Sequence, residues 1–308
     1  MKNLLSVVLP AYNEAETIFR AASKIAAVLQ QADILYELIF IDDGSKDGTW
    51  SEICKAHGEN PRVRGVRFSK NFGKESAIFA GISYAKGDCC AVMDCDLQHP
   101  PEKLVDMYRL WEKGAQIVEG VKISRGNESA AYSFGARCFY KLISKSIGFD
   151  MTKASDFKLL DRKAVDVLRT MGEKHVFFRG LSSWVGFETA QVPFDVAPRA
   201  AGTTKWSSWS LVKYAVRNIT SFSSLPLHLI TILGVLVLVL SVVLGSIALY
   251  QKAVGIAQDG FTTVIVVLLF IGSVIMISLG CIGYYIAKIY EEIKGRPRYI
   301  VADTCGNE

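Results

Sequence analysis

The chain has 308 residues, of which half are apolar and 21% are charged, and its formal net charge is +5. The mean hydropathy of +0.25 averages two unlike regions, because Lys252 and Asp259 are the only charged residues between Leu225 and Ala287. These values exclude a disordered chain, a disulfide-stapled mini-protein, a collagen and a plain soluble domain. We therefore expect a soluble head attached to a membrane anchor.

The first 120 residues alternate between two hydrophobic periods. Short apolar runs bounded by Gly, Pro, Asp or Lys are typical of buried strands, and they are predicted at 4–9, 38–41, 63–68, 89–93 and 117–121. Helical patterns lie between them, at 14–29, 49–57, 74–85 and 101–111. This alternation predicts an α/β domain whose mostly parallel sheet is flanked by helices.

Three further segments carry helical patterns before the anchor. Residues 129–147 bear basic residues, and residues 163–171 form a shorter helix. Residues 203–224 place aromatic and apolar residues beside basic ones at helical spacing, which favours a helix lying in the membrane interface. A buried core helix is the alternative for this segment.

Two apolar stretches follow, at 229–250 and 261–287, and each is long enough to cross about 30 Å of hydrocarbon. Basic residues flank the pair on its outer sides, whereas the turn at 251–260 contains only Lys252, so both termini are predicted to be cytoplasmic. The seven cysteines include no CxxC pair, which favours reduced thiols in a cytosolic head. We expect a multi-pass protein of the inner or plasma membrane.

Polar motifs follow the first two predicted strands. Pro10-Ala-Tyr-Asn-Glu14 ends the first, and Ile41-Asp-Asp-Gly-Ser45 ends the second. Each alone is common turn and helix-cap chemistry. Ligands of open α/β sheets bind beyond the carboxyl ends of the strands, so two such motifs at one edge favour a binding site. Neither a GxGxxG nor a GxxxxGK[ST] motif is present to explain them.

A third motif, at the end of the fourth predicted strand, contains Asp94, Asp96 and Gln98. Two carboxylates and an amide oxygen are hard ligands that suit Mg²⁺ or Mn²⁺, which share substrate phosphates. A solvated acidic turn is the alternative. His99 is expected to be a turn residue rather than a further ligand.

Together these three motifs resemble the family-2 glycosyltransferases of the GT-A fold. The sequence is similar above all to polyprenyl-phosphate glycosyltransferases, the group of bactoprenol glucosyltransferases and dolichol-phosphate mannose synthases. The motifs that carry this closer resemblance are NFGK (71–74) with Ala77, DCDLQHPPE (94–102), SDFKLLDR (155–162), FFRGL (177–181) and GTTKW (202–206). Ala200 departs from the aromatic residue that is more usual there. The Gln-x-x-Arg-Trp motif of processive synthases is absent, which favours transfer of a single sugar.

The resemblance implies four regions: a cytoplasmic GT-A catalytic domain (1–202), a juxtamembrane amphipathic region (203–228), two transmembrane helices (229–287) and a cytoplasmic tail (288–308). It also implies a nucleotide-sugar site made of Pro10, Tyr12, Glu14, Asp42, Asp43, Asp94, Arg199 and Lys205. For Arg199 and Lys205 the alternative is that their side chains snorkel at the edge of the membrane.

The resemblance further implies that Asp94, Asp96 and Gln98 hold Mg²⁺ or Mn²⁺ and that Asp96 and Asp156 are catalytic. A divalent cation stabilises the negative charge that grows on a leaving diphosphate. Asp156 occupies the base position of the family. A phosphomonoester acceptor is already mostly ionised at pH 7, however, because its second pKa is about 6. The alternative is that Asp156 orients the acceptor or offsets oxocarbenium charge at the anomeric carbon.

Arg125 and Arg137 are the candidates for binding the acceptor phosphate, and a solvated basic helix face is their alternative. The expected reaction is inverting transfer of one sugar from a nucleotide-sugar, with UDP-glucose favoured, to undecaprenyl phosphate or a related polyprenyl phosphate. Donors that carry N-acetylglucosamine, mannose or aminoarabinose are alternatives, as is a soluble hydroxyl acceptor. A non-catalytic membrane protein that binds a nucleotide-sugar is the alternative to an enzyme, and the protein could form a homo-oligomer. No nucleic-acid partner is expected.

Overall fold

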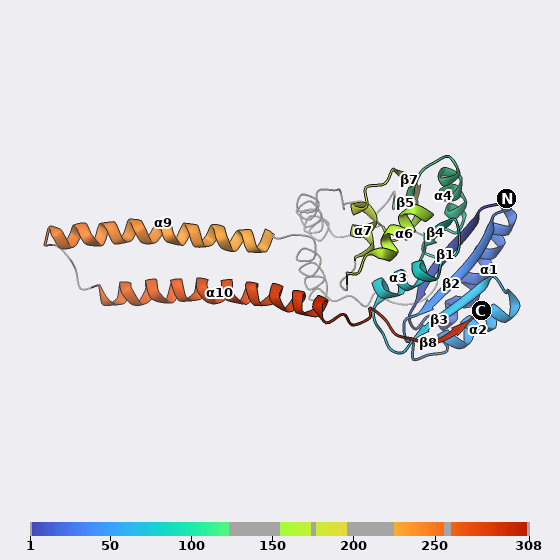
Figure 1. The fold of residues 1–308 in the computed structure, drawn as a ribbon, viewed down its shortest axis with the longest axis horizontal. Helices are drawn as coiled ribbons and strands as arrows, with labels where there is room; N and C mark the ends of the chain where they lie inside the picture. The colour runs from blue at the N-terminus through green and yellow to red at the C-terminus, as the bar shows by residue number, and fades with distance from the viewer. Residues whose placement is uncertain (1, 123–154, 174–176, 196–224, 256–259, 307–308) are drawn as a thin grey trace. The chain divides into compact units, whose positions relative to one another are not determined.

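The computed structural model describes residues 2–122, 155–173, 177–195, 225–255 and 260–306 (Figure 1). The chain divides into two compact units. The head comprises Met1–Leu211 together with Pro297–Glu308, and the second unit comprises Val212–Arg296.

The head is built on an eight-stranded sheet with the strand order β7-β5-β6-β4-β1-β2-β3-β8. The strands are β1 (Leu4–Ala11), β2 (Leu35–Asp42), β3 (Val63–Phe68), β4 (Cys89–Val92), β5 (Ile117–Lys122), β6 (Lys158–Asp161), β7 (Thr189–Phe194) and β8 (Val301–Cys305). The helices described in the head are α1 (Ala15–Gln31), α2 (Thr49–Glu59), α3 (Lys74–Tyr84), α4 (Glu102–Glu112), α6 (Arg162–Thr170) and α7 (Phe178–Trp184).

The centre of the sheet is parallel. Strand β1 pairs in parallel with β2 on one side and β4 on the other, and β2 continues to β3 in the same sense. These strands are apolar on both faces because helices cover both, as in α1, which buries Ile18, Ile25 and Leu29 against them. The carboxyl ends of β1, β2 and β4 therefore lie at one edge, and the three polar motifs meet there.

The predicted fold class is confirmed, and the structure adds antiparallel strands that the sequence patterns did not predict. Strand β6 runs antiparallel between β4 and β5, and β8 runs antiparallel to β3. Both strands are short, and neither has the alternating or continuous apolar pattern of the others, since β6 begins at Lys158 and β8 is mostly exposed.

The C-terminal segment returns to the head sheet after the second apolar helix. Tyr299 stacks on Phe68 with ring centroids 4.8 Å apart, and Cys305 pairs with Gly65 of β3. A Cβ atom on Gly65 would lie 2.6 Å from the Cys305 sulfur, so glycine is needed for this close approach. Residues 297–306 are thus part of the folded head.

The second unit contains two long apolar helices, α9 (Leu225–Ala253) and α10 (Phe261–Ile293), which pack antiparallel to one another (Figure 1). Their segments Ile230–Ile247 and Phe270–Ile293 are long and apolar enough to cross a membrane. They overlap the two predicted spans. The predicted helices at 129–147 and 203–224 lie outside the described residues.

Candidate active site

A cavity of ≈370 Å³ lies where the loops after β1, β2 and β4 meet the start of α3. Six of the predicted site residues line it: Pro10, Tyr12, Glu14, Asp43, Asp94 and Asp96. The chain also contributes Asn71, Gly73, Lys74 and Ala77, which belong to the NFGK motif and its neighbour in α3. The four motifs therefore form one site.

Hydrogen bonds tie the loop after β1 to the loop after β2. The backbone N–H of Asn13 donates to Ser45 Oγ at 2.9 Å, and Lys46 N–H donates back to Asn13 Oδ1 at 3.0 Å. Asn13 has φ 54°, a left-handed conformation that asparagine tolerates better than most residues. Glu14 N–H donates to Thr49 Oγ1 at 2.9 Å. These bonds hold the two loops together beside the cavity, which Glu14 lines.

The two acids of the second motif have different environments. Asp42 is fully buried, its Oδ1 accepts from Ser45 N–H at 2.9 Å, and it is not among the lining residues. No described residue hydrogen-bonds to Asp42 Oδ2, although Arg67 Nε lies 3.7 Å from it. Asp43 lines the cavity and accepts from the N–H groups of Phe72 and Gly73, and burial raises its pKa to about 6. Asp42 shapes the turn, whereas Asp43 fastens the loop that leads into α3.

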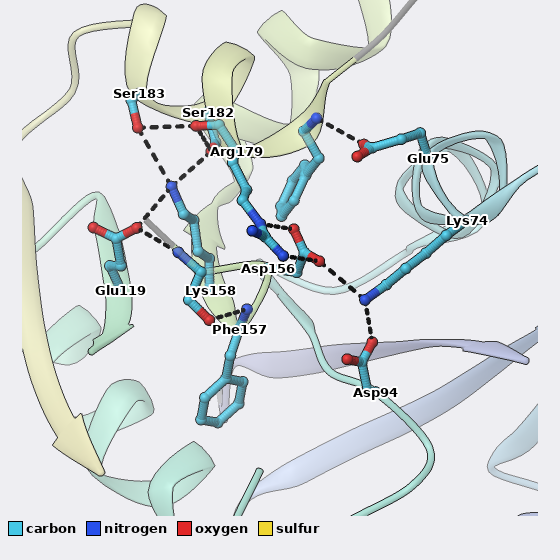
Figure 2. Close-up of polar contacts among 12 residues, drawn as sticks. Lys74, Glu75, Asp94, Glu119, Asp156, Phe157, Lys158, Arg179, Ser182 and Ser183 are labelled. Atoms are coloured by element: carbon cyan, nitrogen blue, oxygen red, sulfur yellow. Dashed lines mark hydrogen bonds and ion pairs between the residues drawn. The ribbon is translucent and has the colours of Figure 1, made fainter. Parts of the chain in front are cut away.

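A chain of alternating charges runs from Asp94 to Arg179 (Figure 2). Lys74 Nζ lies 2.6 Å from Asp94 Oδ1 and 2.9 Å from Asp156 Oδ2. Arg179 donates to both oxygens of Asp156, from Nε at 2.7 Å and from Nη2 at 2.9 Å. Burial by itself raises the pKa of Asp156, but the two cations outweigh it and hold that pKa far below its usual range. Asp156 is therefore a stable carboxylate that receives three charged hydrogen bonds.

Beside Asp156, a second buried network fastens α7 to the sheet (Figure 2). Lys158 Nζ lies 3.1 Å from Glu119 and donates to Ser182 Oγ of α7 at 2.9 Å. Burial lowers the pKa of Lys158. Glu75 of α3 accepts from the N–H of Phe178 at the start of α7, at 2.8 Å. Both contacts position α7, and with it Arg179, against the site.

The structure separates the residues around the Asp-x-Asp turn into two groups. His99 follows the turn and is buried, and its ring stacks on that of Phe157 with centroids 4.8 Å apart. The side chain therefore packs against the core. Gln98 does not line the cavity, and its backbone N–H donates to Asp96 Oδ1 at 3.0 Å. Asp94 and Asp96 both line it.

The donor set at this turn fits a hard divalent cation that arrives with a phosphate. Among the described residues, no group of three or more His, Cys, Asp or Glu forms a metal site by itself. Mg²⁺ is, however, commonly bound by only one or two carboxylates together with waters and substrate phosphates. Asp94 and Asp96 meet that requirement, and at present Asp94 is paired with Lys74.

Lys74 and Arg179 are site residues that the sequence patterns do not predict individually. Both belong to motifs that carry the family resemblance, at 71–74 and 177–181. A lysine at the start of a helix beside a strand-end motif is a usable signal for Lys74. No local pattern indicates the pairing of Arg179 with Asp156. The predicted residues Arg125, Arg137, Arg199 and Lys205 lie outside the described residues.

Comparison with known proteins identifies relatives over nearly the whole chain. Residues 6–168 match the profile described as Glycosyl transferase family 2. An uncharacterized glycosyltransferase of Synechocystis is 39% identical over 99% of this chain and 96% of the relative. The bactoprenol glucosyl transferase of Shigella phage SfII is 36% identical over 96% of this chain and 97% of the relative.

Among solved structures, glucosyl-3-phosphoglycerate synthase from Mycobacterium tuberculosis, in complex with Mg²⁺ and uridine-diphosphate, is 21% identical to this chain with a TM-score of 0.49. The alignment covers 72% of this chain and 79% of that one.

Proposed function

Because the chain belongs to glycosyl transferase family 2 and is a glycosyltransferase, we propose that it transfers one sugar from a nucleotide-sugar to a polyprenyl phosphate. The observation that carries the proposal is the cavity itself, in which the loops after β1 and β2 meet the carboxylate pair after β4. Similarity to phage bactoprenol glucosyl transferases extends over 96% of the chain and supports both a lipid acceptor and glucose as the sugar.

The nucleotide-sugar is proposed to bind along the loops after β1 and β2. Pro10, Tyr12, Glu14 and Asp43 line the cavity there, and Asp42 supports the turn from behind. Arg199 and Lys205 are proposed to add positive charge beside the diphosphate. Arginine suits this role because its planar guanidinium forms paired hydrogen bonds with phosphate oxygens.

Asp94 and Asp96 are proposed to hold Mg²⁺ or Mn²⁺, with Gln98 as a third ligand. When bound, the cation supplies Lewis-acid stabilisation of the charge that develops on the leaving diphosphate. The position of Asp94 and Asp96 in the cavity and the oxygen-only donors of the turn support the assignment for these two residues, whereas Gln98 is proposed from its place in the motif. The protein contributes the rest of the site through charged side chains and backbone groups that the fold holds around the cavity.

We infer that Asp156 positions its cations and does not remove a proton. Its carboxylate is saturated by Lys74 and Arg179, and its pKa lies far below neutrality, so it is a poor proton acceptor at pH 7. The proposed acceptor needs no base, because a phosphomonoester has a second pKa of about 6. Inversion then follows from direct attack of the acceptor phosphate on the anomeric carbon, with Arg125 and Arg137 binding that phosphate.

The two apolar helices support a membrane location for the enzyme. We propose that α9 and α10 cross the inner or plasma membrane with both termini in the cytoplasm, because the flanking segments are rich in Lys and Arg. Tethering the head to the bilayer would raise the effective concentration of a lipid acceptor at the active site.

A donor panel tests the proposed reaction. The full-length protein in nanodiscs would be incubated with undecaprenyl phosphate, Mg²⁺ and radiolabelled UDP-glucose, UDP-N-acetylglucosamine or GDP-mannose. We expect a radiolabelled lipid product, which forms fastest from UDP-glucose and about 10²–10³-fold more slowly with Asp96→Ala. Binding of nucleotide-sugar without any lipid product would favour the non-catalytic alternative, and transfer to a soluble hydroxyl acceptor would overturn the proposed acceptor.

A further inference from the structure

Lys74 is paired with Asp94, one of the two carboxylates proposed to hold the divalent cation. Its ammonium is 2.6 Å from Asp94 Oδ1 and 2.9 Å from Asp156 Oδ2, so it bridges the two carboxylates (Figure 2). Asp94 is one of the two acids that line the cavity at the Asp-x-Asp turn. An ammonium and a divalent cation repel one another and compete for the same carboxylate oxygen.

The surroundings of Lys74 allow it to leave Asp94. Its side chain is 43% exposed and lines the cavity, whereas the Asp156 side chain is only 8% exposed. Asp156 keeps two hydrogen bonds from Arg179 when Lys74 turns away, so no buried charge is left unpaired. The four-carbon stem of lysine gives its ammonium the reach to turn into the cavity.

We propose that Lys74 is a place-holding cation, which neutralises Asp94 in the donor-free enzyme and transfers to the donor diphosphate when the divalent cation takes its place. This inference rests on the proposed function, because it assumes that Asp94 becomes a metal ligand. It assigns Lys74 a role in the order of binding: the metal alone must displace the ammonium, whereas metal and diphosphate together provide the ammonium with a new partner.

The consequence is a thermodynamic coupling between metal and nucleotide that passes through one side chain. Nucleotide should tighten metal binding, and metal should tighten nucleotide binding by the same factor. Part of this coupling comes from direct contact between metal and phosphate, and that part does not depend on Lys74. The part that depends on Lys74 disappears when its charge is removed.

The test measures Mn²⁺ binding directly, by the electron paramagnetic resonance signal of free Mn²⁺, with the full-length protein in detergent. Wild type, Lys74→Gln, Lys74→Arg and Lys70→Gln would each be titrated without nucleotide and with saturating UDP. Lys70 is a matched control, because it is exposed, lies near the same loop and contacts the Phe72 ring, at 5.2 Å, rather than Asp94.

We expect Lys74→Gln to bind Mn²⁺ without nucleotide about tenfold more tightly than wild type, within the usual range of coupling between two sites. UDP should then improve its Mn²⁺ affinity about tenfold less than it does for wild type. Lys74→Arg keeps the charge and should bind Mn²⁺ alone as weakly as wild type, and Lys70→Gln should change neither affinity. Adding Asp94→Asn to Lys74→Gln should abolish the tighter site.

The outcomes separate this inference from the proposed function. If wild type binds Mn²⁺ with UDP but Lys74→Gln binds Mn²⁺ alone no more tightly than wild type, the place-holding role is overturned and the metal site stands. If wild type binds no Mn²⁺ even with UDP, the metal assignment of the proposed function fails. If Lys74→Gln does not fold, Lys74→Arg tests the place-holding role instead. This variant keeps the positive charge, so tighter binding of Mn²⁺ without nucleotide would contradict competition between that charge and the metal.

Discussion

Asp156 illustrates how a residue's chemistry depends on its partners more than on its type. Two cations donate three hydrogen bonds to its carboxylate, and its side chain is almost completely buried. A sequence motif marks the position as important but cannot distinguish a proton acceptor from an ion-pair centre. The geometry favours the ion-pair centre, because a carboxylate with a strongly lowered pKa holds a proton too weakly to act as a base near neutrality.

Asp156→Asn separates these roles by the pH dependence of the rate. If Asp156 only positions cations, we expect the variant to keep part of its activity and its rate to rise between pH 5 and 7, as the lipid phosphate ionises. Loss of an obligatory base removes about 10²–10⁴-fold at every pH. Steady-state kinetics in nanodiscs over this range would measure the difference, and a pH-independent loss of four decades would restore the base.

Asp96→Ala tests the carboxylate pair at the cavity. We expect activity to fall by about 10²–10³-fold, the usual cost of removing one group that stabilises developing charge. EDTA should abolish wild-type activity, and Mg²⁺ or Mn²⁺ should restore it. Asp106→Ala is the matched control, because Asp106 is an exposed acid of α4 paired with Lys103 and lies outside the cavity. An active Asp96→Ala variant with normal metal dependence would remove Asp96 from the metal site.

At the scale of the elements, contacts between α3 and α7 position the charged chain. Lys74 and Glu75 are the first two residues of α3, and they reach Asp156 and the N-terminus of α7, respectively. Burial raises the pKa of Glu75 from its ordinary value of 4.5 to about 7. Because Glu75 joins α3 to α7, the free energy of unfolding of the head should depend on pH near neutrality.

Glu75→Gln tests this coupling. A raised pKa means that the folded state favours the protonated form, so the stability that Glu75 contributes is complete below pH 4.5 and is lost as the pH rises towards 7. The variant keeps an oxygen that can accept from Phe178 N–H. We therefore expect equal stability at pH 4 and a gain of about 1–3 kcal/mol over wild type at pH 8. Thermal unfolding at four pH values would check it, and parallel curves for the two proteins would contradict it.

Strand β8 depends on a glycine of its neighbour, and this too can be tested. A Cβ atom at position 65 would lie 2.6 Å from both Cys305 Sγ and the Ile53 side chain, so Gly65→Ala should destabilise the head by about 1–3 kcal/mol. Gly58→Ala is the control, because nothing lies within 4 Å of its Cβ position in α2. A lower melting temperature is expected for Gly65→Ala alone, and unchanged melting would mean that β8 is not packed as described.

At the scale of the whole molecule, the pairing of β8 with β3 constrains the membrane topology. The two strands flank the apolar helices in the sequence yet share one sheet, so head and C-terminus must lie on the same side of any membrane that α9 and α10 cross. An even number of spans satisfies this requirement. We propose that this common side is the cytoplasm, because the segments that flank the two helices are basic.

Reporter fusions test the topology. A reporter after Glu308 should be cytoplasmic, and one inserted near Gly255, between the two helices, should be on the opposite side of the membrane. A fusion at the N-terminus is the internal control and should match the fusion after Glu308. Equal locations for Gly255 and Glu308 would show that the apolar helices do not form a spanning hairpin.

The strands and helices of the central sheet were largely predictable because their signals are local. Buried parallel strands are short apolar runs, and in amphipathic helices apolar residues recur every three or four positions. Polar motifs stand at the strand ends. Predicted and observed bounds agree closely, as at 63–68 for β3 and at the start of α3. Strands β6, β7 and β8 escaped prediction because their pairing, rather than their composition, makes them strands.

Local sequence signals are enough to place three acidic and polar loops at one sheet edge, because parallel strands end where their neighbours end. They are also enough to place two apolar helices after the head, because the length and composition of these segments admit little else. The roles of the charged residues, in contrast, follow from the packing of the folded chain. Lys74 meets Asp156 across 82 residues of sequence and Arg179 meets it across 23, and such pairings depend on the packing of α3 and α7 against the sheet rather than on any local pattern.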